Sequence, residues 1–374
     1  MDACGVGALP DAASYGDEGT NTLVHLAEQA GGLDLPVLGS LGLGSIVAIE
    51  GVPPAASPVL HGRVGAVGPG KESTTGHWEL MGVRVERALP TYPEGFPPEV
   101  VTALEQATGQ GYCCNRPFSG TAVLDAFGEH HLESGELILY TSADSVLQIA
   151  AHIDVLSEPE LYAVCEAARE VMSGEHAVGR VIARPFDGAA GAWHRRDGRR
   201  DFALAPPSRS YLEELQAAGV PVHGVGKIRD LFAGVGVDVK HAGATNAEGI
   251  AATTALLREL EEGLIFVNLV ETDQVYGHRH DVPGFAKALR AIDDAVGEWL
   301  GLLGSDDLLV LTADHGVDPT TNHTDHTREY APLLARFEGN AGRRHDGALA
   351  DVGASVMQWL TRREVPELPG TSFV

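Results

Sequence analysis

Two pairs of acidic and imidazole side chains follow apolar stretches of the chain, and their placement constrains the fold more than any other feature. Asp314 and His315 come directly after one apolar run, and Asp273 and His278 follow a second, 264–270. Side chains that follow the strands of an open α/β sheet gather at its carboxyl edge, where such sheets bind ligands. Carboxylates and imidazoles held together are ligands for divalent metals. The pattern predicts a metal site with room for two ions; acidic polar loops are the alternative for either pair alone.

The charge balance excludes two classes of partner. The 374 residues include 52 acidic and 26 basic side chains, which gives a net charge of −26. A field of this sign repels nucleic acid and anionic lipid, so we expect neither as a partner. A phosphorylated substrate would need a local basic pocket, and arginines concentrated at 180–200 together with Lys227 could supply it, because guanidinium groups match phosphate geometry. Surface salt bridges are the alternative for several of these arginines.

The cysteines and the hydropathy favour a soluble cytoplasmic protein. The four cysteines lack a CxxC spacing, and the adjacent Cys113 and Cys114 cannot easily join in a mutual disulfide. We therefore expect reduced thiols. No apolar run approaches membrane-spanning length, and the first residues show no basic-then-apolar signal pattern.

The length and the distribution of proline predict two domains. Proline-rich stretches at 88–98 and 205–208 bracket a segment that carries its own predicted strands and helices. After this segment strands and helices alternate, which is typical of α/β folds. We expect a mostly parallel sheet flanked by helices in a core made of residues 1–88 and 211–374, with a smaller α/β cap domain inserted at 89–210.

A third group of reactive side chains lies at 70–79. Ser73, Thr74 and Thr75 stand there between glycines and are followed by His77. A hydroxyl on such a turn suits a nucleophile whose pKa a metal can lower. Taken alone, the segment is better explained as a polar loop whose hydroxyls cap a helix.

These segments together resemble the phosphopentomutase family of the alkaline phosphatase superfamily, nearly from end to end. Gly-His-Trp-Glu, Thr-Ser-Ala-Asp-Ser and Asp-His-Thr-Arg-Glu are highly specific in combination. The resemblance implies an alkaline-phosphatase-like core and a cytoplasmic enzyme of nucleoside salvage. The matching segments are 2–7, 19–23, 70–79, 140–148, 178–186, 226–228, 268–270, 276–279, 312–316 and 324–329.

The resemblance also implies a set of metal ligands. The family pattern calls for two manganese ions, and mixed imidazole and carboxylate ligation suits divalent manganese, although it also suits zinc. Three residues match the ligands of one ion: Asp273, His278 and His326. The ligands of the other ion match Asp2, Asp314 and His315.

Ser73 stands where the family carries its phosphorylated threonine, so a hydroxyl is retained; Thr74 and Thr75 are the alternatives. Arg180, Arg195 and Lys227 match positions that hold the distal phosphate of the substrate in the family. The match of Arg195 could shift by one residue, because several arginines lie next to it in the sequence. Positions near the sugar match Ser142 and Asp144.

The implied reaction interconverts ribose 1-phosphate and ribose 5-phosphate, and the 2-deoxyribose pair. Phosphorylated Ser73 donates its phosphoryl group to the free hydroxyl of the bound pentose monophosphate, and the resulting 1,5-bisphosphate reorients and returns its other phosphate. Two metals clamp the phosphoryl oxygens. A sugar bisphosphate would act as the activator, and the cap domain would exclude water.

Two departures from the family pattern stand out. Family members open on an apolar strand that leads into the position of Asp2, and this strand is absent here; we expect that the natural start lies upstream, the alternative being an impaired chain. The other departure is Glu271-Thr272, where the family usually has an Asp before an aromatic residue.

Two other functions remain open. A phosphatase of the same superfamily would use water in place of the sugar hydroxyl, and the six candidate ligands do not separate it from a mutase. The basic positions do, because only a mutase must hold a second phosphate during transfer. An inactive protein that binds a sugar phosphate is the other alternative. Retention of all six candidate metal ligands argues against it.

Overall fold

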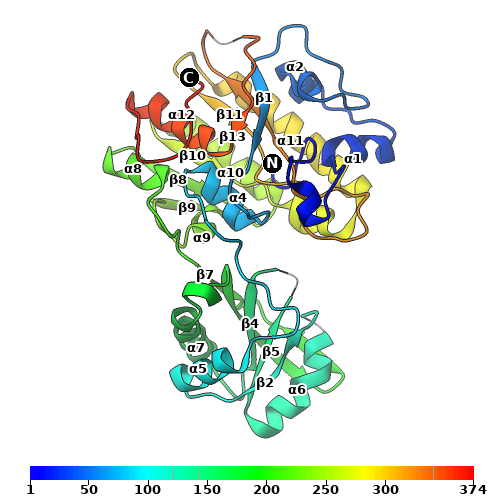
Figure 1. Ribbon diagram of the computed structural model, residues 1–374, viewed down its shortest axis with the longest axis vertical. Coiled ribbons are helices and arrows are strands. Elements are labelled where there is room, and N and C mark those ends of the chain that lie inside the picture. Colours follow the sequence, from blue (N-terminus) through cyan, green and yellow to red (C-terminus); the bar gives the residue numbers. More distant parts are fainter. Residues whose placement is uncertain (121, 143, 340) are drawn as a thin grey trace. The chain divides into compact units, whose positions relative to one another are not determined.

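The computed structural model describes residues 1–120, 122–142, 144–339 and 341–374, and these form two compact units (Figure 1). The first unit contains residues 1–87 and 206–374, and the second contains residues 88–205. Both units combine β-sheets with flanking helices, so the expected α/β class is confirmed. No helix among the described residues has the length and apolar character needed to cross a membrane.

The first unit holds two sheets. One has the order β11-β12-β1-β13, and its sense is mixed because β12 runs antiparallel to both of its neighbours while β1 and β13 are parallel. The other has the order β10-β8-β9 and is parallel throughout. The mostly parallel sheet that we expected is therefore present only in the second of these. The strands are β1 (Leu60–Gly65), β8 (Val222–Val225), β9 (Val239–His241), β10 (Leu264–Val267), β11 (Leu309–Leu311), β12 (Ala331–Arg336) and β13 (Gly347–Ala348).

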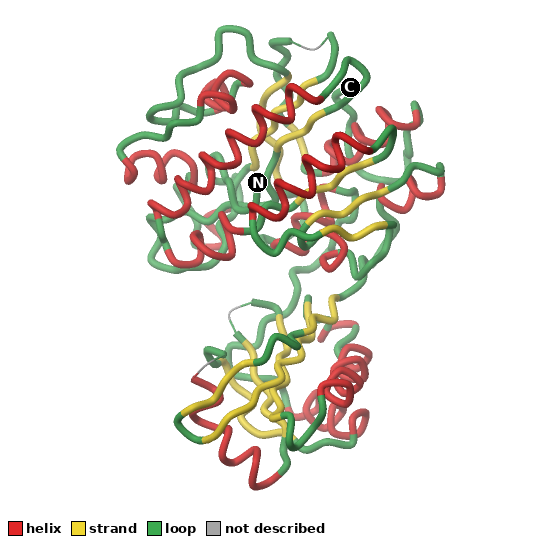
Figure 2. Tube along the Cα trace, turned by 180° about the vertical axis from the view of Figure 1, so that it is seen from behind, coloured by secondary structure: helices red, strands yellow, loops and turns green. Residues whose placement is uncertain are grey.

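Helices lie across the strands of the first unit (Figure 2). The longest of them, α11, begins after Asp281, whose side chain accepts a hydrogen bond from the Gly284 amide at 3.0 Å, and it buries an apolar face. Phe285, Leu289 and Trp299 lie on this face at the helical spacing of the sequence. The helices are α1 (Thr22–Ala30), α2 (Pro36–Leu41), α3 (Leu43–Ile46), α4 (Ser73–Leu80), α8 (Tyr211–Ala217), α9 (Ile228–Leu231), α10 (Asn246–Glu259), α11 (Val282–Leu302) and α12 (Ala350–Thr361).

Short helical turns complete the first unit, and one of them is unusual. The turn that follows β10 is π-helical, a form found mostly as single turns at functional sites. These turns are η1 (Ala12–Tyr15), η3 (Thr272–Tyr276) and η4 (Gly277–Arg279).

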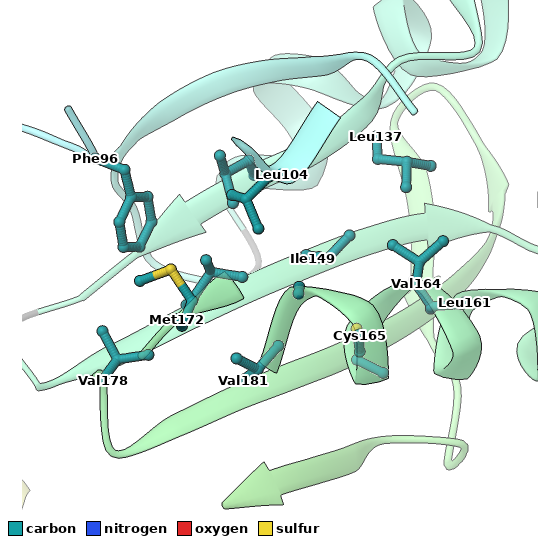
Figure 3. Close-up of a cluster of buried hydrophobic side chains, with 14 of the residues drawn as sticks. Phe96, Leu104, Leu137, Ile149, Leu161, Val164, Cys165, Met172, Val178 and Val181 are labelled. Atoms are coloured by element: carbon teal, nitrogen blue, oxygen red, sulfur yellow. The ribbon is translucent and has the colours of Figure 1, made fainter. Parts of the chain in front are cut away.

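The second unit is a sheet with helices on both faces. Its strands have the order β2-β3-β4-β5-β6, and β7 pairs with β5. All seven residues of β4 are buried, because its side chains alternate between the two faces of the sheet. Leu147 and Ile149 belong to one cluster of buried apolar side chains, in which Figure 3 labels Ile149, and Ala150 belongs to another. Its elements are α5 (Pro98–Thr108), β2 (Tyr112–Pro117), α6 (Ala122–Ser134), β3 (Leu137–Thr141), β4 (Val146–His152), α7 (Glu158–Val171), η2 (Gly174–His176), β5 (Arg180–Ala189), β6 (Ala192–Arg195) and β7 (Arg200–Ala203).

One buried carboxylate ties the first residues of the chain to the segment before β12. Glu329 accepts hydrogen bonds from the Gly7 and Thr22 amides at 3.2 and 2.8 Å, and from the hydroxyls of Thr22 and Thr327, each at 2.7 Å. Backbone hydrogen bonds join Val6 to Tyr330 in the same region. Glu329 therefore fixes the path of the segment that carries Asp2.

Glu329→Gln should lower the free energy of unfolding by about 2–3 kcal/mol, because the amide turns an N–H group toward donors that stay buried without an acceptor. Urea denaturation measures this loss. The matched substitution at the exposed Glu338 should change the stability by less than about 0.5 kcal/mol. Equal effects at the two positions would contradict the role assigned to Glu329.

Candidate metal centre

Three buried side chains form the first group of metal donors. Asp2 lies in the N-terminal segment, and Asp314 and His315 lie in the loop after β11, beyond Thr312 and Ala313. The His315 Nε2 atom lies 3.1 Å from Asp314 Oδ2 and 3.8 Å from Asp2 Oδ1. One donor atom from each residue lies within 4.8 Å of the others. The structure thus brings together all three residues that the sequence suggested for one ion.

The second group lies beside the first and shares His315 with it. Donor atoms of Asp273, His315 and His326 lie within 4.8 Å of one another. His326 Nε2 and His278 Nε2 each lie 3.3 Å from Asp273 Oδ1. His278 is about one-third exposed, and its Nδ1 faces the Thr324 carbonyl oxygen at 2.6 Å, which leaves Nε2 directed at Asp273. The residues suggested for the other ion therefore also converge, and His315 lies between the groups.

The residues present fit divalent metals. Buried polar atoms are normally hydrogen-bonded. Among the described residues, several buried donor atoms of this centre make no hydrogen bond of good geometry, although some lie beside an opposite charge. They are the kinds of atom that bind divalent metals through oxygen and imidazole nitrogen. These atoms are Asp2 Oδ1 and Oδ2, Asp273 Oδ1, Asp314 Oδ2, and His326 Nδ1 and Nε2.

The pKa values of the centre also indicate that its buried negative charge favours a bound positive charge. Burial, together with the negative charges of Asp314 and Asp273, raises the pKa of Asp2 to about 7. Burial alone would lower the pKa of His315, but the carboxylates of Asp314, Asp273 and Asp2 together outweigh it and the pKa rises to about 10. Although burial opposes its ionisation, His315 and His77 hold the pKa of Asp314 well below its usual range. Without cations, protons compensate part of this buried negative charge.

Ser73 is the first residue of α4, and its hydroxyl faces the centre. The Ser73 Oγ atom lies 3.1 Å from His315 Nε2. Helix α4 approaches Asp314 closely because Gly76 has no side chain, and a Cβ there would lie 2.7 Å from the Asp314 carbonyl oxygen. Thr74 and Thr75 are buried on the same helix, and the hydroxyl of Thr75 donates to the Glu72 carbonyl at 3.1 Å. Among these three hydroxyl side chains, Ser73 is the one hydrogen-bonded to a residue of the centre.

Two buried charged residues hold the loop that precedes Ser73. Glu79 accepts hydrogen bonds from the Val67 and Gly68 amides. Arg328 donates to the Gly70 carbonyl at 2.6 Å, and its guanidinium also donates to Asp11. The loop is therefore fixed from both sides.

Other residues around the centre were not among the sites predicted from the sequence. His77 lies four residues after Ser73, and its Nδ1 is 2.8 Å from the Ser73 carbonyl and 3.2 Å from Asp314 Oδ2. Lys71 lies 3.2 Å from the buried Asp17 and 3.5 Å from Asp325. The i, i+4 spacing of Ser73 and His77 is a signal that could have identified His77, since such residues share a helix face. Nothing in the sequence near Asp17 indicates that this residue pairs with Lys71.

The basic and polar residues suggested for substrate binding are divided between the two units. Lys227 follows β8 in the first unit, and its positive charge opposes the rise in the pKa of Asp2 that burial and the other aspartates cause, so the two side chains lie within electrostatic reach. The other four lie in the second unit, where Arg180 is 3.7 Å from Asp144. Ser142 directly follows β3, and position 143 lies outside the described residues.

Arg195 lies apart from the ion pair of Arg180. It is on β6, and its Nε donates to the Gly120 carbonyl at 3.0 Å. Asp201 instead binds Arg199 through two hydrogen bonds of 2.7 Å each and lies 3.6 Å from Arg180. The sequence included Arg199 in the basic set at 180–200 but did not predict its pairing with Asp201, because the run 195–200 offers four arginines of identical chemistry.

Comparisons with known proteins place the chain in a family. Residues 1–363 match the model of the metalloenzyme superfamily. A phosphopentomutase of Dictyoglomus thermophilum is 50% identical over 379 residues, which covers 100% of this chain and 96% of the relative. A phosphopentomutase of Anaeromyxobacter sp. strain K is 49% identical, with the same coverage of both chains.

A solved structure, that of the PH0037 protein from Pyrococcus horikoshii, aligns over 97% of this chain and 96% of its own, with a TM-score of 0.50 and 15% identity. At that identity it supports the fold alone. The sequence relatives decide the family, because both are close to half identical over the full chain. The chain therefore belongs to the metalloenzyme superfamily and, within it, to the phosphopentomutase family.

Proposed function

We propose that this protein is a phosphopentomutase that interconverts ribose 1-phosphate and ribose 5-phosphate, and the 2-deoxyribose pair, in the cytoplasm. The observation that carries the proposal is the 3.1 Å contact between the hydroxyl of Ser73 and His315, inside a centre with two groups of metal donors. A nucleophilic hydroxyl beside such a centre is the arrangement required for phosphoryl transfer through a covalent intermediate.

Two divalent ions would complete the site, and we propose manganese for both. Asp273, His278 and His326 would hold one ion, and Asp2, Asp314 and His315 would hold the other. When bound, the ions neutralise the charge that develops on the phosphoryl oxygens and lower the pKa of a hydroxyl. The unpartnered carboxylate and imidazole atoms of the centre support this assignment.

The chain's own residues then carry the phosphoryl group between two oxygens of the sugar. In the phosphorylated form of Ser73, the bond between phosphorus and Ser73 Oγ breaks as a bond from phosphorus to the free sugar hydroxyl forms. The sugar hydroxyl loses its proton and Ser73 Oγ takes one up, so Ser73 returns to a free hydroxyl. The product of this step is a pentose 1,5-bisphosphate, which reorients and returns its other phosphoryl group to Ser73. A sugar bisphosphate would therefore activate the enzyme by phosphorylating Ser73.

Basic residues would hold the phosphate that is not being transferred. We assign this role to Lys227, Arg180 and Arg195, and contacts with the sugar to Ser142 and Asp144. The fixed positive charge of Lys227 near Asp2 supports the first of these. A hydrolase has no need to hold a second phosphate, so these residues distinguish the two reactions.

Ser73→Ala should reduce isomerisation by at least roughly 10³-fold, because no other hydroxyl replaces the nucleophile. Mass spectrometry after incubation with ribose 1,5-bisphosphate should show one added phosphoryl group on the wild-type chain and none on the variant. Ser73→Thr should retain both phosphorylation and activity, since it restores a hydroxyl. Phosphorylation that persists in Ser73→Ala and disappears in Thr74→Val would move the nucleophile to Thr74.

Lys227→Met should raise the KM for ribose 5-phosphate by about 10- to 100-fold. A change of this size corresponds to the binding free energy lost when one hydrogen bond to a charged group is removed. The exposed Lys240, which pairs with Asp230 at 2.7 Å, provides the matched control, and Lys240→Met should leave the KM unchanged. Steady-state kinetics measures both values. An unchanged KM in Lys227→Met would remove this residue from the phosphate site.

Binding of Mn²⁺ to the metal-stripped chain should release protons, and the affinity should rise from about pH 5 to pH 8. The sign follows from the raised pKa values of Asp2 and His315, about 7 and about 10, because both groups keep their protons at the lower pH and must lose them to bind a metal. Calorimetry in buffers of different ionisation enthalpy counts the protons, and Asp2→Asn should release fewer. An affinity independent of pH would contradict the assignment of these two ligands.

A further inference from the structure

A further group of potential metal donors lies in the second unit and belongs to neither group of the centre described above. Cys113 lies on β2, His130 lies near the end of α6, and Glu136 lies in the turn between α6 and β3. One donor atom from each of the three residues lies within 4.8 Å of the others. A sulfur, an imidazole nitrogen and a carboxylate oxygen thus lie close together, supplied by β2, by α6 and by the turn that follows α6.

Two of the three donors are held in place by the end of helix α6. The His130 Nε2 atom lies 2.7 Å from Glu136 Oε2. Ser134 joins the two residues through the backbone, because its hydroxyl donates to the His130 carbonyl at 2.8 Å and accepts from the Glu136 amide at 3.1 Å. The Glu136 carbonyl is also fixed, by His131 Nδ1 at 2.7 Å. The imidazole and the carboxylate therefore need little reorganisation to share a ligand.

The third donor is fixed by the sheet. Strand β2 runs parallel to β3 with Cys113 opposite Ile138, and the Cys113 Sγ lies 3.6 Å from the Leu137 carbonyl oxygen. Burial and, to a smaller extent, the nearby charge of Glu136 raise the pKa of Cys113 to about 12. The thiol is therefore protonated on its own, and a bound cation would displace this proton, as it does at other metal-bound thiols.

The donor set indicates which cation fits. Thiolate and imidazole ligands favour zinc over magnesium, calcium or manganese, which prefer oxygen. Three protein ligands leave one position of a tetrahedral ion for water. The His130 and Glu136 side chains are 51% and 44% exposed, so solvent reaches the point where the donors meet.

We propose that Cys113, His130 and Glu136 bind one zinc ion, with water as its fourth ligand, and that this ion ties β2 to the end of α6. The proposal does not depend on the phosphoryl-transfer function. It makes the second unit a metal-binding domain in its own right.

Cobalt separates this site from the centre of the first unit, because a thiolate bonded to Co²⁺ gives an intense near-ultraviolet charge-transfer band that carboxylates and imidazoles do not give. Titration of the full metal-stripped chain with Co²⁺ should produce this band, and Zn²⁺ should abolish it by displacement. Cys113→Ser should lose the band. His130→Gln and Glu136→Gln should weaken binding at the site by at least about tenfold.

Two matched thiol variants serve as controls. Cys114→Ser changes the neighbouring residue on β2, and Cys4→Ser changes the buried thiol that lies beside Asp2. Both should keep the band. The proposal is overturned if saturating Co²⁺ produces no charge-transfer band on the folded chain, or if the band survives in Cys113→Ser. Circular dichroism establishes folding, and the exposed Glu136→Gln supplies an independent test if Cys113→Ser fails to fold.

Discussion

Three aspartates and two histidines meet in the interior of the first unit, and the cost of burying their charges governs the structure around them. Asp2, Asp273 and Asp314 are each at most 5% exposed, and they repel one another through a medium that screens charge poorly. His315 lies between them and compensates part of the charge. The remaining oxygen and nitrogen atoms without hydrogen bonds are expensive to bury. Bound divalent cations would offset this cost, so the atoms that are expensive to bury are also the ones that would provide the binding energy for metal.

The surrounding residues keep these groups in place against their mutual repulsion. Glu329 anchors the N-terminal segment that carries Asp2, while Arg328, its neighbour in sequence, fixes the loop before Ser73. The Met1 nitrogen lies 2.9 Å from the Thr312 carbonyl oxygen, just before the segment that carries Asp314. Parts of the chain more than 300 residues apart are thus joined at the centre, and this explains why the site needs the complete first unit.

The sequence predicted the fold class and the placement of Asp314, His315, Asp273 and His278 after apolar strands because both depend on local patterns, whereas Asp2 and His326 were expected as ligands only from the resemblance to the family. Asp314 and His315 follow an apolar strand, and α11 shows its helical spacing directly. Long-range pairing has no such signal, so the antiparallel insertion of β12 between β1 and β11 was not predicted.

The details of the site depend on the same long-range geometry. The position of His315 between both donor groups follows from packing, as does the contact of His77 with Asp314. Arg195 illustrates a different limit, since several arginines within six residues are chemically equivalent and only the register of β6 and β7 separates them.

The most direct test of the account is the ratio of isomerisation to phosphate release with ribose 1-phosphate, Mn²⁺ and a catalytic amount of ribose 1,5-bisphosphate. A mutase that keeps the phosphoryl group on Ser73 until a sugar hydroxyl accepts it should form ribose 5-phosphate with little free phosphate. Release of phosphate without ribose 5-phosphate would contradict the account and make water the acceptor.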